Sequence, residues 1–146
     1  MAVTAKWYGN ALLKALNKEI DWDSDTIKVM LCTNLYEPDQ DTHIYKSSVD
    51  NEVANGSGYT TGGETLANKA IDYDGPTNVI KLDGGDVTWS AASITARYAI
   101  IYDDTPATDA IKPLLAYVDF GADVTSTNGD FKITWDEDGI LTITAA

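Results

Sequence analysis

From residue 64 onwards the sequence is a succession of short segments in which Thr, Val, Ile, Tyr and Trp recur, and this pattern constrains the fold more than any other feature. Such residues favour strands, and turn-forming pairs such as Gly84-Gly85, Asn128-Gly129 and Asp138-Gly139 separate the segments. About seven or eight strands at this spacing predict a mainly β fold, an antiparallel β-sandwich or a jelly-roll-like domain. The segments are "ETLANKAIDYD", "NVIKLDG", "DVTWS", "SITARYAIIYD", "KPLLAYVDFG", "DFKITWD" and "GILTITA".

An earlier strand is predicted at residues 26–33, "TIKVMLCT". Ile27, Val29 and Leu31 alternate on one face, while Met30 and Cys32 make the other face apolar too, so we expect a central strand. Cys32 is the single cysteine, and in this apolar run we expect it to pack as a small hydrophobe rather than to react.

A second central strand is predicted within "SITARYAIIYD". Strict alternation divides its side chains between two faces. One face would carry Ile94, Ala96, Tyr98, Ile100 and Tyr102, and the other Thr95, Arg97, Ala99 and Ile101.

Residues 5–20, "AKWYGNALLKALNKEI", have apolar residues about four apart, which predicts one N-terminal amphipathic helix. We expect it to dock on the sheet through Tyr8, Leu12 and Leu16, because an apolar stripe in a monomer needs a covering surface.

Residues 34–63 have no clear period and are too long for an ordinary connection, although "THIYKSSVDNEV" could hold a short helix. We interpret this segment as the main contact with partner proteins. The alternative is that its apolar and aromatic side chains pin a long loop onto its own domain. The candidate contacts are Tyr36, His43, Ile44, Tyr45 and Tyr59.

The chain reads as one domain over residues 1–146, without repeats or a linker. Its formal charge of -13 argues against binding to nucleic acid or to an anionic membrane. Residues 1–13 lack the pattern of a secretory signal, and no stretch approaches the roughly 18 apolar residues that span a bilayer. We therefore expect synthesis in the cytoplasm.

The adjacent carboxylates Asp103 and Asp104 resemble half of a two-metal polymerase site, but no third carboxylate or basic partner is evident in the sequence. "DDTP" is typical of a turn in which an aspartate accepts from the backbone two residues on. A structural calcium ion, bound with Asp109, is the alternative. "WDEDG" at residues 135–139 is interpreted as a hairpin turn, since the ligand spacing of a calcium loop is missing.

No other motif supports catalysis or a cofactor. His43 is the only histidine, which excludes a histidine-rich zinc site, and no nucleophile elbow accompanies it. "NGSGYTTGG" at residues 55–63 lacks the lysine of a phosphate loop. Trp89 and Trp135 are expected in the core rather than in a sugar-stacking platform, and Trp22, between two aspartates, is expected to be exposed. We predict no catalytic residue, cofactor or metal.

Over almost its full length the chain resembles small acidic structural proteins encoded by tailed bacteriophages. Such proteins are described as capsid decoration, head-fibre or minor tail proteins. The stretches that carry the resemblance are "DWDSDTIKVMLCT", "YEPDQDTHIYKSSVDNEV", "GYTTGGETLANK", "ITARYAIIYDDTPATDAIKPLLAYVDFG" and "GILTIT".

This resemblance implies a non-enzymatic virion protein whose partners are other virion proteins of the capsid or tail, with a homo-oligomer as a further alternative. We expect decoration of the outer shell, as a capsid decoration or head-fibre protein, because an acidic domain there has no use for phosphate binding. A tail or fibre component that contacts host receptors or glycans is the alternative.

Overall fold

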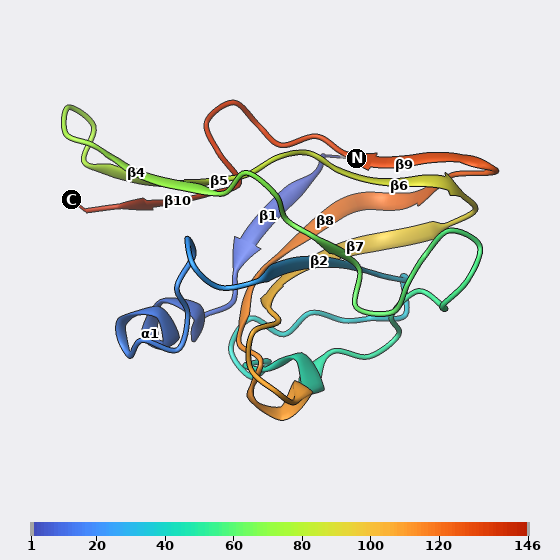
Figure 1. Cartoon of the computed structure of the whole chain (residues 1–146), viewed down its shortest axis with the longest axis horizontal. Coiled ribbons are helices and arrows are strands. Elements are labelled where there is room, and N and C mark those ends of the chain that lie inside the picture. The colour runs from blue at the N-terminus through green and yellow to red at the C-terminus, as the bar shows by residue number, and fades with distance from the viewer. Residues whose placement is uncertain (1, 146) are drawn as a thin grey trace.

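The structure is a computed structural model that describes residues 2–145, and it is mainly β (Figure 1). Its larger layer is a five-stranded sheet with the order β1-β8-β7-β2-β3, in which every pair is antiparallel. The strands of this sheet are β1 (Thr4–Trp7), β2 (Ile27–Cys32), β3 (Glu64–Thr65), β7 (Thr95–Asp103) and β8 (Leu114–Thr125).

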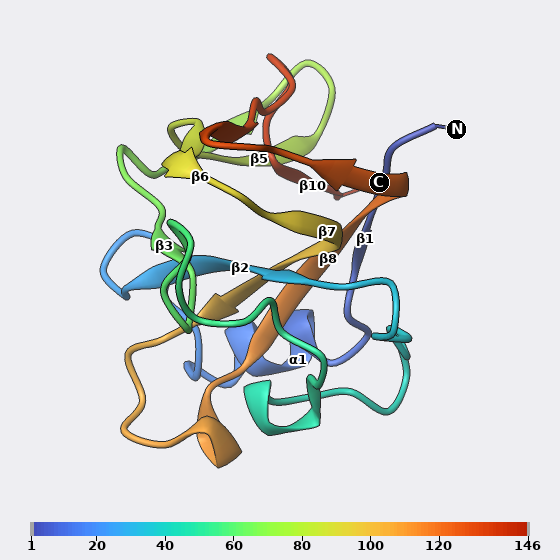
Figure 2. The same cartoon turned by 90° about the vertical axis from the view of Figure 1, so that its right-hand side faces the viewer.

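A smaller layer lies across one face of this sheet, as Figure 2 shows from the side. It consists of a three-stranded sheet, β10-β5-β4, and a pair, β6-β9, both antiparallel. The arrangement confirms an antiparallel sandwich-like domain. The strands are β4 (Ala70–Asp74), β5 (Val79–Asp83), β6 (Val87–Ala92), β9 (Gly129–Ile133) and β10 (Leu141–Thr144).

The main core fills the space between the two layers. Ile27, Val29 and Leu31 of β2 enter it from the larger sheet, as their alternation predicts. Trp89 of β6 and Phe131 of β9 meet them from the smaller layer, with ring centroids 5.9 Å apart. Burial of these side chains supplies most of the driving force for bringing the layers together.

β7 is central, between β8 and β2, but the predicted division of its side chains is wrong. Ala96 and Ala99 both face the main core, whereas Tyr98 faces the opposite side of the sheet. The register between β7 and β8 shifts between Ala96 and Tyr98. Because side chains alternate, a shift of one residue exchanges the two faces of everything that follows.

The helix predicted over residues 5–20 is much shorter. Residues 4–7 instead form β1, which pairs with β8 along the edge of the larger sheet, and α1 covers only Ala11–Leu16. Sheet pairing here outweighs helical periodicity, and Gly9 and Asn10 separate the two elements. Lys18, with φ of 63°, adopts the left-handed conformation just after the helix and turns the chain away.

The far face of the larger sheet carries a second apolar cluster of seven buried residues: Tyr8, Met30, Cys32, Tyr36, Ile100, Tyr102 and Leu114. Residues 34–63 run across this face and contribute Tyr36. The predicted short helix in this segment is a single 3-10 turn, η1 (Lys46–Ser48), which lies against a second turn, η2 (Asp109–Ile111). Cys32 is buried as predicted.

Candidate functional site

The carboxylates at the end of β7 form a turn, as the sequence predicts. The Asp103 side chain is fully buried, and its Oδ1 accepts from the Thr105 backbone N–H at 2.9 Å. Asp104 instead pairs with two lysines, Lys28 at 3.0 Å and Lys112 at 2.6 Å. The two neighbouring acids therefore lie in opposite surroundings, one apolar and one cationic.

Their pKa values shift in opposite directions for this reason. Burial, together with a hydrogen bond to the Asp25 carboxyl, raises the pKa of Asp103 to about 7. Burial also acts to raise the pKa of Asp104, but the ammonium groups of Lys112 and Lys28 outweigh it and hold that pKa below its usual range. Asp103 Oδ2 is buried and has no hydrogen-bond partner within residues 2–145, which also favours the neutral, protonated form of this carboxyl.

Asp109, the proposed additional calcium ligand, lies in an ion-pair network instead. Its carboxylate contacts Lys46 at 2.9 Å and Lys112 at 3.4 Å. Within residues 2–145 no group of three or more His, Cys, Asp or Glu side chains is arranged to hold a metal ion. The acidic residues at this end of β7 thus neutralise lysines that join η1, η2 and the turn.

Two of the five candidate partner contacts are buried inside the domain. Tyr36 is 1% exposed; its hydroxyl lies 2.7 Å from that of Tyr8 and 2.9 Å from His43 Nδ1. Tyr59 lies under β6, donates to Glu52 and accepts from the Leu31 backbone N–H. For these two tyrosines the structure supports the alternative, that the side chain pins the loop onto its own domain.

His43, Ile44 and Tyr45 are half-buried and remain accessible in part. The His43 ring stacks against Tyr36 with centroids 5.7 Å apart. The Tyr45 hydroxyl accepts from Lys14 Nζ of α1 at 2.6 Å. These contacts tie residues 43–45 to α1 and to the second apolar cluster, and they leave only part of each side chain for a partner.

The exposed face of α1 carries leucines, and this feature contradicts the predicted docking of the helix. Only Ala11 of the helix is buried, whereas Leu16 is 85% exposed and Leu13 is 53% exposed. Leu12 is exposed as well, so of the three predicted docking residues only Tyr8 is buried. We call Leu12, Leu13 and Leu16 the helix patch.

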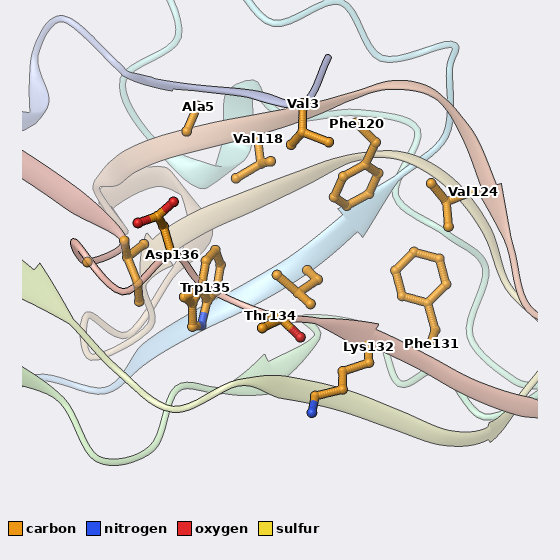
Figure 3. Close-up of a pocket in the computed structure, with 13 residues that line it drawn as sticks. Val3, Ala5, Val118, Phe120, Val124, Phe131, Lys132, Thr134, Trp135 and Asp136 are labelled. Carbon is orange, nitrogen blue, oxygen red and sulfur yellow. The ribbon is translucent and has the colours of Figure 1, made fainter. Parts of the chain in front are cut away.

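An open groove lies between the two layers along the side where β1 ends the larger sheet (Figure 3). It has a volume of about 600 Å³. Val3 and Ala5 are exposed here, whereas Trp7, at the other end of β1, donates its indole N–H to the Thr142 carbonyl of β10. From this side the groove is lined by Val3, Ala5, Val118, Phe120 and Val124.

The opposite wall comes from β9 and the segment that follows it. Figure 3 shows Phe131 and Trp135 facing Val118 and Phe120 across the groove. The rings of Phe120 and Phe131 lie 6.1 Å apart, and the Trp135 indole N–H donates to the Gly85 carbonyl at 2.9 Å. This mostly apolar lining, with a few polar groups at the rim, is typical of sites that bind a ligand or a peptide.

Two tryptophan predictions have different outcomes. Trp89 is in the core as expected. Trp22 is 5% exposed rather than solvent-facing, and its indole N–H donates to the Ala70 and Asp83 carbonyls.

The sequence did not predict the groove. Alternation of apolar and polar residues indicates which side chains face the interior, but it does not indicate whether strands of a second sheet cover those side chains. Its only signal was the number of aromatic residues near residues 120–135.

Comparison of the chain with models of known protein families, with curated proteins and with solved structures found no match. Within residues 2–145 the helices are all too short to span a bilayer.

Proposed function

We propose that this chain is a non-enzymatic structural protein of a bacteriophage particle, located on the outer shell as a capsid decoration or head-fibre protein. The helix patch is the observation that carries the proposal. Leucines on a surface helix normally face the core, whereas Leu12, Leu13 and Leu16 face outward on a domain of high negative charge.

Burial of the helix patch against a shell protein would provide the binding energy. Complete burial of one exposed leucine is worth about 1.5–3 kcal/mol relative to water, and the most exposed leucine gains most. The patch begins only five residues after β1, and Lys14 between its leucines is already held by Glu19 and Tyr45. The helix is therefore fixed in place before it meets a partner, which lowers the ordering cost of binding.

The net charge of -13 supports an external position. A protein that repels phosphate gains nothing from contact with packaged DNA, whereas on the outer surface its charge keeps particles apart. The resemblance of the sequence to tailed-phage virion proteins supports the same placement.

Co-sedimentation with undecorated particles tests the proposal. The double variant Leu12→Ser and Leu16→Ser should bind about tenfold or more weakly, since it removes two apolar contacts. Leu35→Ser is the matched control, because Leu35 is a similarly exposed leucine that lies outside both the helix patch and the groove. Equal binding by wild type, control and double variant would reject the helix patch as the contact.

A tail or fibre component that contacts host receptors or glycans is the second candidate, and the open groove favours it. Trp135 is half-buried there beside Thr134 and Asp136, which gives an aromatic surface with polar neighbours. A glycan array with the isolated protein tests this candidate. Binding that is lost in Trp135→Ala but kept in the helix-patch variant would support the tail assignment.

A further inference from the structure

The unpaired edge of β1 runs beside the open groove. β1 pairs only with β8, and its other side has no neighbouring strand within residues 2–145. A free strand edge presents backbone N–H and C=O groups that can pair with a further strand. Here the free edge and the apolar groove share Ala5, whereas the Trp7 carbonyl of the same edge already accepts from the Gln40 side chain at 2.6 Å.

The direction of the backbone groups follows from the hydrogen bonds. The Tyr8 N–H donates to the Leu115 carbonyl of β8 at 2.9 Å. In an antiparallel pair, hydrogen-bonded positions alternate, so Lys6 and Thr4 also direct their backbone groups toward β8. Ala5 lies between them and directs its N–H and C=O outward, while its side chain lines the groove.

The charges around the groove indicate which kind of ligand it would bind. Lys132 at the rim is paired with Asp86 at 3.2 Å, so its charge is offset. Asp136 lines the groove, and Glu137 and Asp138 follow it in the loop. The groove therefore combines an apolar interior with an acidic end on a domain of charge -13.

We propose that the groove and the β1 edge bind an extended, positively charged segment of a partner protein. The segment adds a strand beside β1, inserts alternate apolar side chains between Phe120 and Trp135, and places lysine or arginine near Asp136. A second copy of this chain is a poorer occupant, because two domains of charge -13 repel each other. The inference is independent of the proposed capsid contact, which concerns α1, although it uses the same groove as the tail candidate.

A peptide titration of the isolated, isotopically labelled protein tests this site. The probe is an N-acetylated, C-amidated hexapeptide of alternating lysine and valine, and its counterpart with glutamate in place of lysine is the control. NMR should show saturable shifts of the Ala5 amide and the Trp135 indole N–H with the lysine peptide only. Shifts of equal size with both peptides, or with neither, would overturn the proposal.

Two kinds of variant locate the binding. Ala5→Pro removes the outward N–H but leaves the pairing with β8 intact, since proline is tolerated at such edge positions. It should weaken the lysine peptide about tenfold. Asp136→Asn should weaken it about two- to fivefold, whereas the matched Asp74→Asn, on β4, should not. Both asparagines keep a side-chain acceptor for the turn bonds that the aspartates make.

The outcomes separate the possible occupants. Unchanged binding by a folded Ala5→Pro protein would reject strand addition. Equal effects of Asp136→Asn and Asp74→Asn would reject a local charge contact. A wild-type dimer that Ala5→Pro abolishes would replace the cationic partner by a second copy of this chain, and would overturn the proposal. None of these results bears on capsid binding through the helix patch.

Discussion

Replacing Asp103 by asparagine should change how the stability of this protein depends on pH. The Asp103 carboxyl is fully buried at the end of β7, and its pKa is raised to about 7 by burial and by the neighbouring Asp25 carboxyl. An asparagine side chain has nearly the same shape. Its oxygen can still accept from the Thr105 backbone N–H, and its amide carries no charge at any pH of the experiment.

The sign of the effect follows from proton binding. In the unfolded chain this carboxyl ionises near pH 3.9, whereas in the folded chain it keeps its proton up to about pH 7. Between these values the folded state binds more protons, so the contribution of Asp103 to stability is complete below about pH 4 and falls as pH rises to 7. A pKa difference of about 3 corresponds to about 4 kcal/mol.

Urea denaturation of wild type and Asp103→Asn from pH 4 to pH 8 measures this difference. The two proteins should have similar free energies of unfolding at pH 4, and the variant should be the more stable one at pH 8 by about 2–4 kcal/mol. Asp104→Asn is the control. Its difference in free energy of unfolding from wild type at pH 8 should have the opposite sign, because Lys28 and Lys112 stabilise the charged form of Asp104. A constant difference between wild type and Asp103→Asn across the pH range would refute the reasoning.

Four further substitutions test packing. Leu16→Ser should alter the free energy of unfolding by less than about 0.5 kcal/mol, because Leu16 is exposed. Leu114→Ala, in the second apolar cluster, should lower it by about 2–5 kcal/mol. A large loss of stability in Leu16→Ser would show that Leu16 packs against the domain. Tyr36→Phe should cost about 1–3 kcal/mol in urea denaturation, because it leaves the buried Tyr8 hydroxyl without its partner at 2.7 Å. Gly63→Ala should destabilise by about 4 kcal/mol or more in thermal unfolding, since Gly63 has φ of +79° and a Cβ there would lie 1.9 Å from a β2 carbonyl oxygen.

The sequence predicts the strands of this fold better than its helix. β2 and β7 are central and carry apolar side chains on both faces. The apolar residues at consecutive positions of these strands can be recognised from the amino-acid sequence alone. The register shift beside Arg97 has no such signal, because it depends on how β8 pairs across from it. Residues 5–20 have a helical period, yet residues 4–7 pair with β8, and only the tertiary structure decides between these alternatives.

The candidate surfaces were predictable only in part. The aspartate turn after β7 follows from local chemistry, and the structure confirms it. Whether an aromatic residue of the long segment is a partner contact or an anchor depends on what covers it. Tyr36 is covered by its own domain, while Tyr45 is covered only in part by α1. The exposure of Leu16 and the groove beside β1 depend on the arrangement of whole elements, which periodicity does not contain.

Electron microscopy of phage particles, with this protein located by gold-labelled antibody or by its density, tests the proposed position most directly. Our account predicts density or label on the outer face of the head, with α1 and its leucines toward the shell. Label confined to the tail, or absent from the particle, would contradict it.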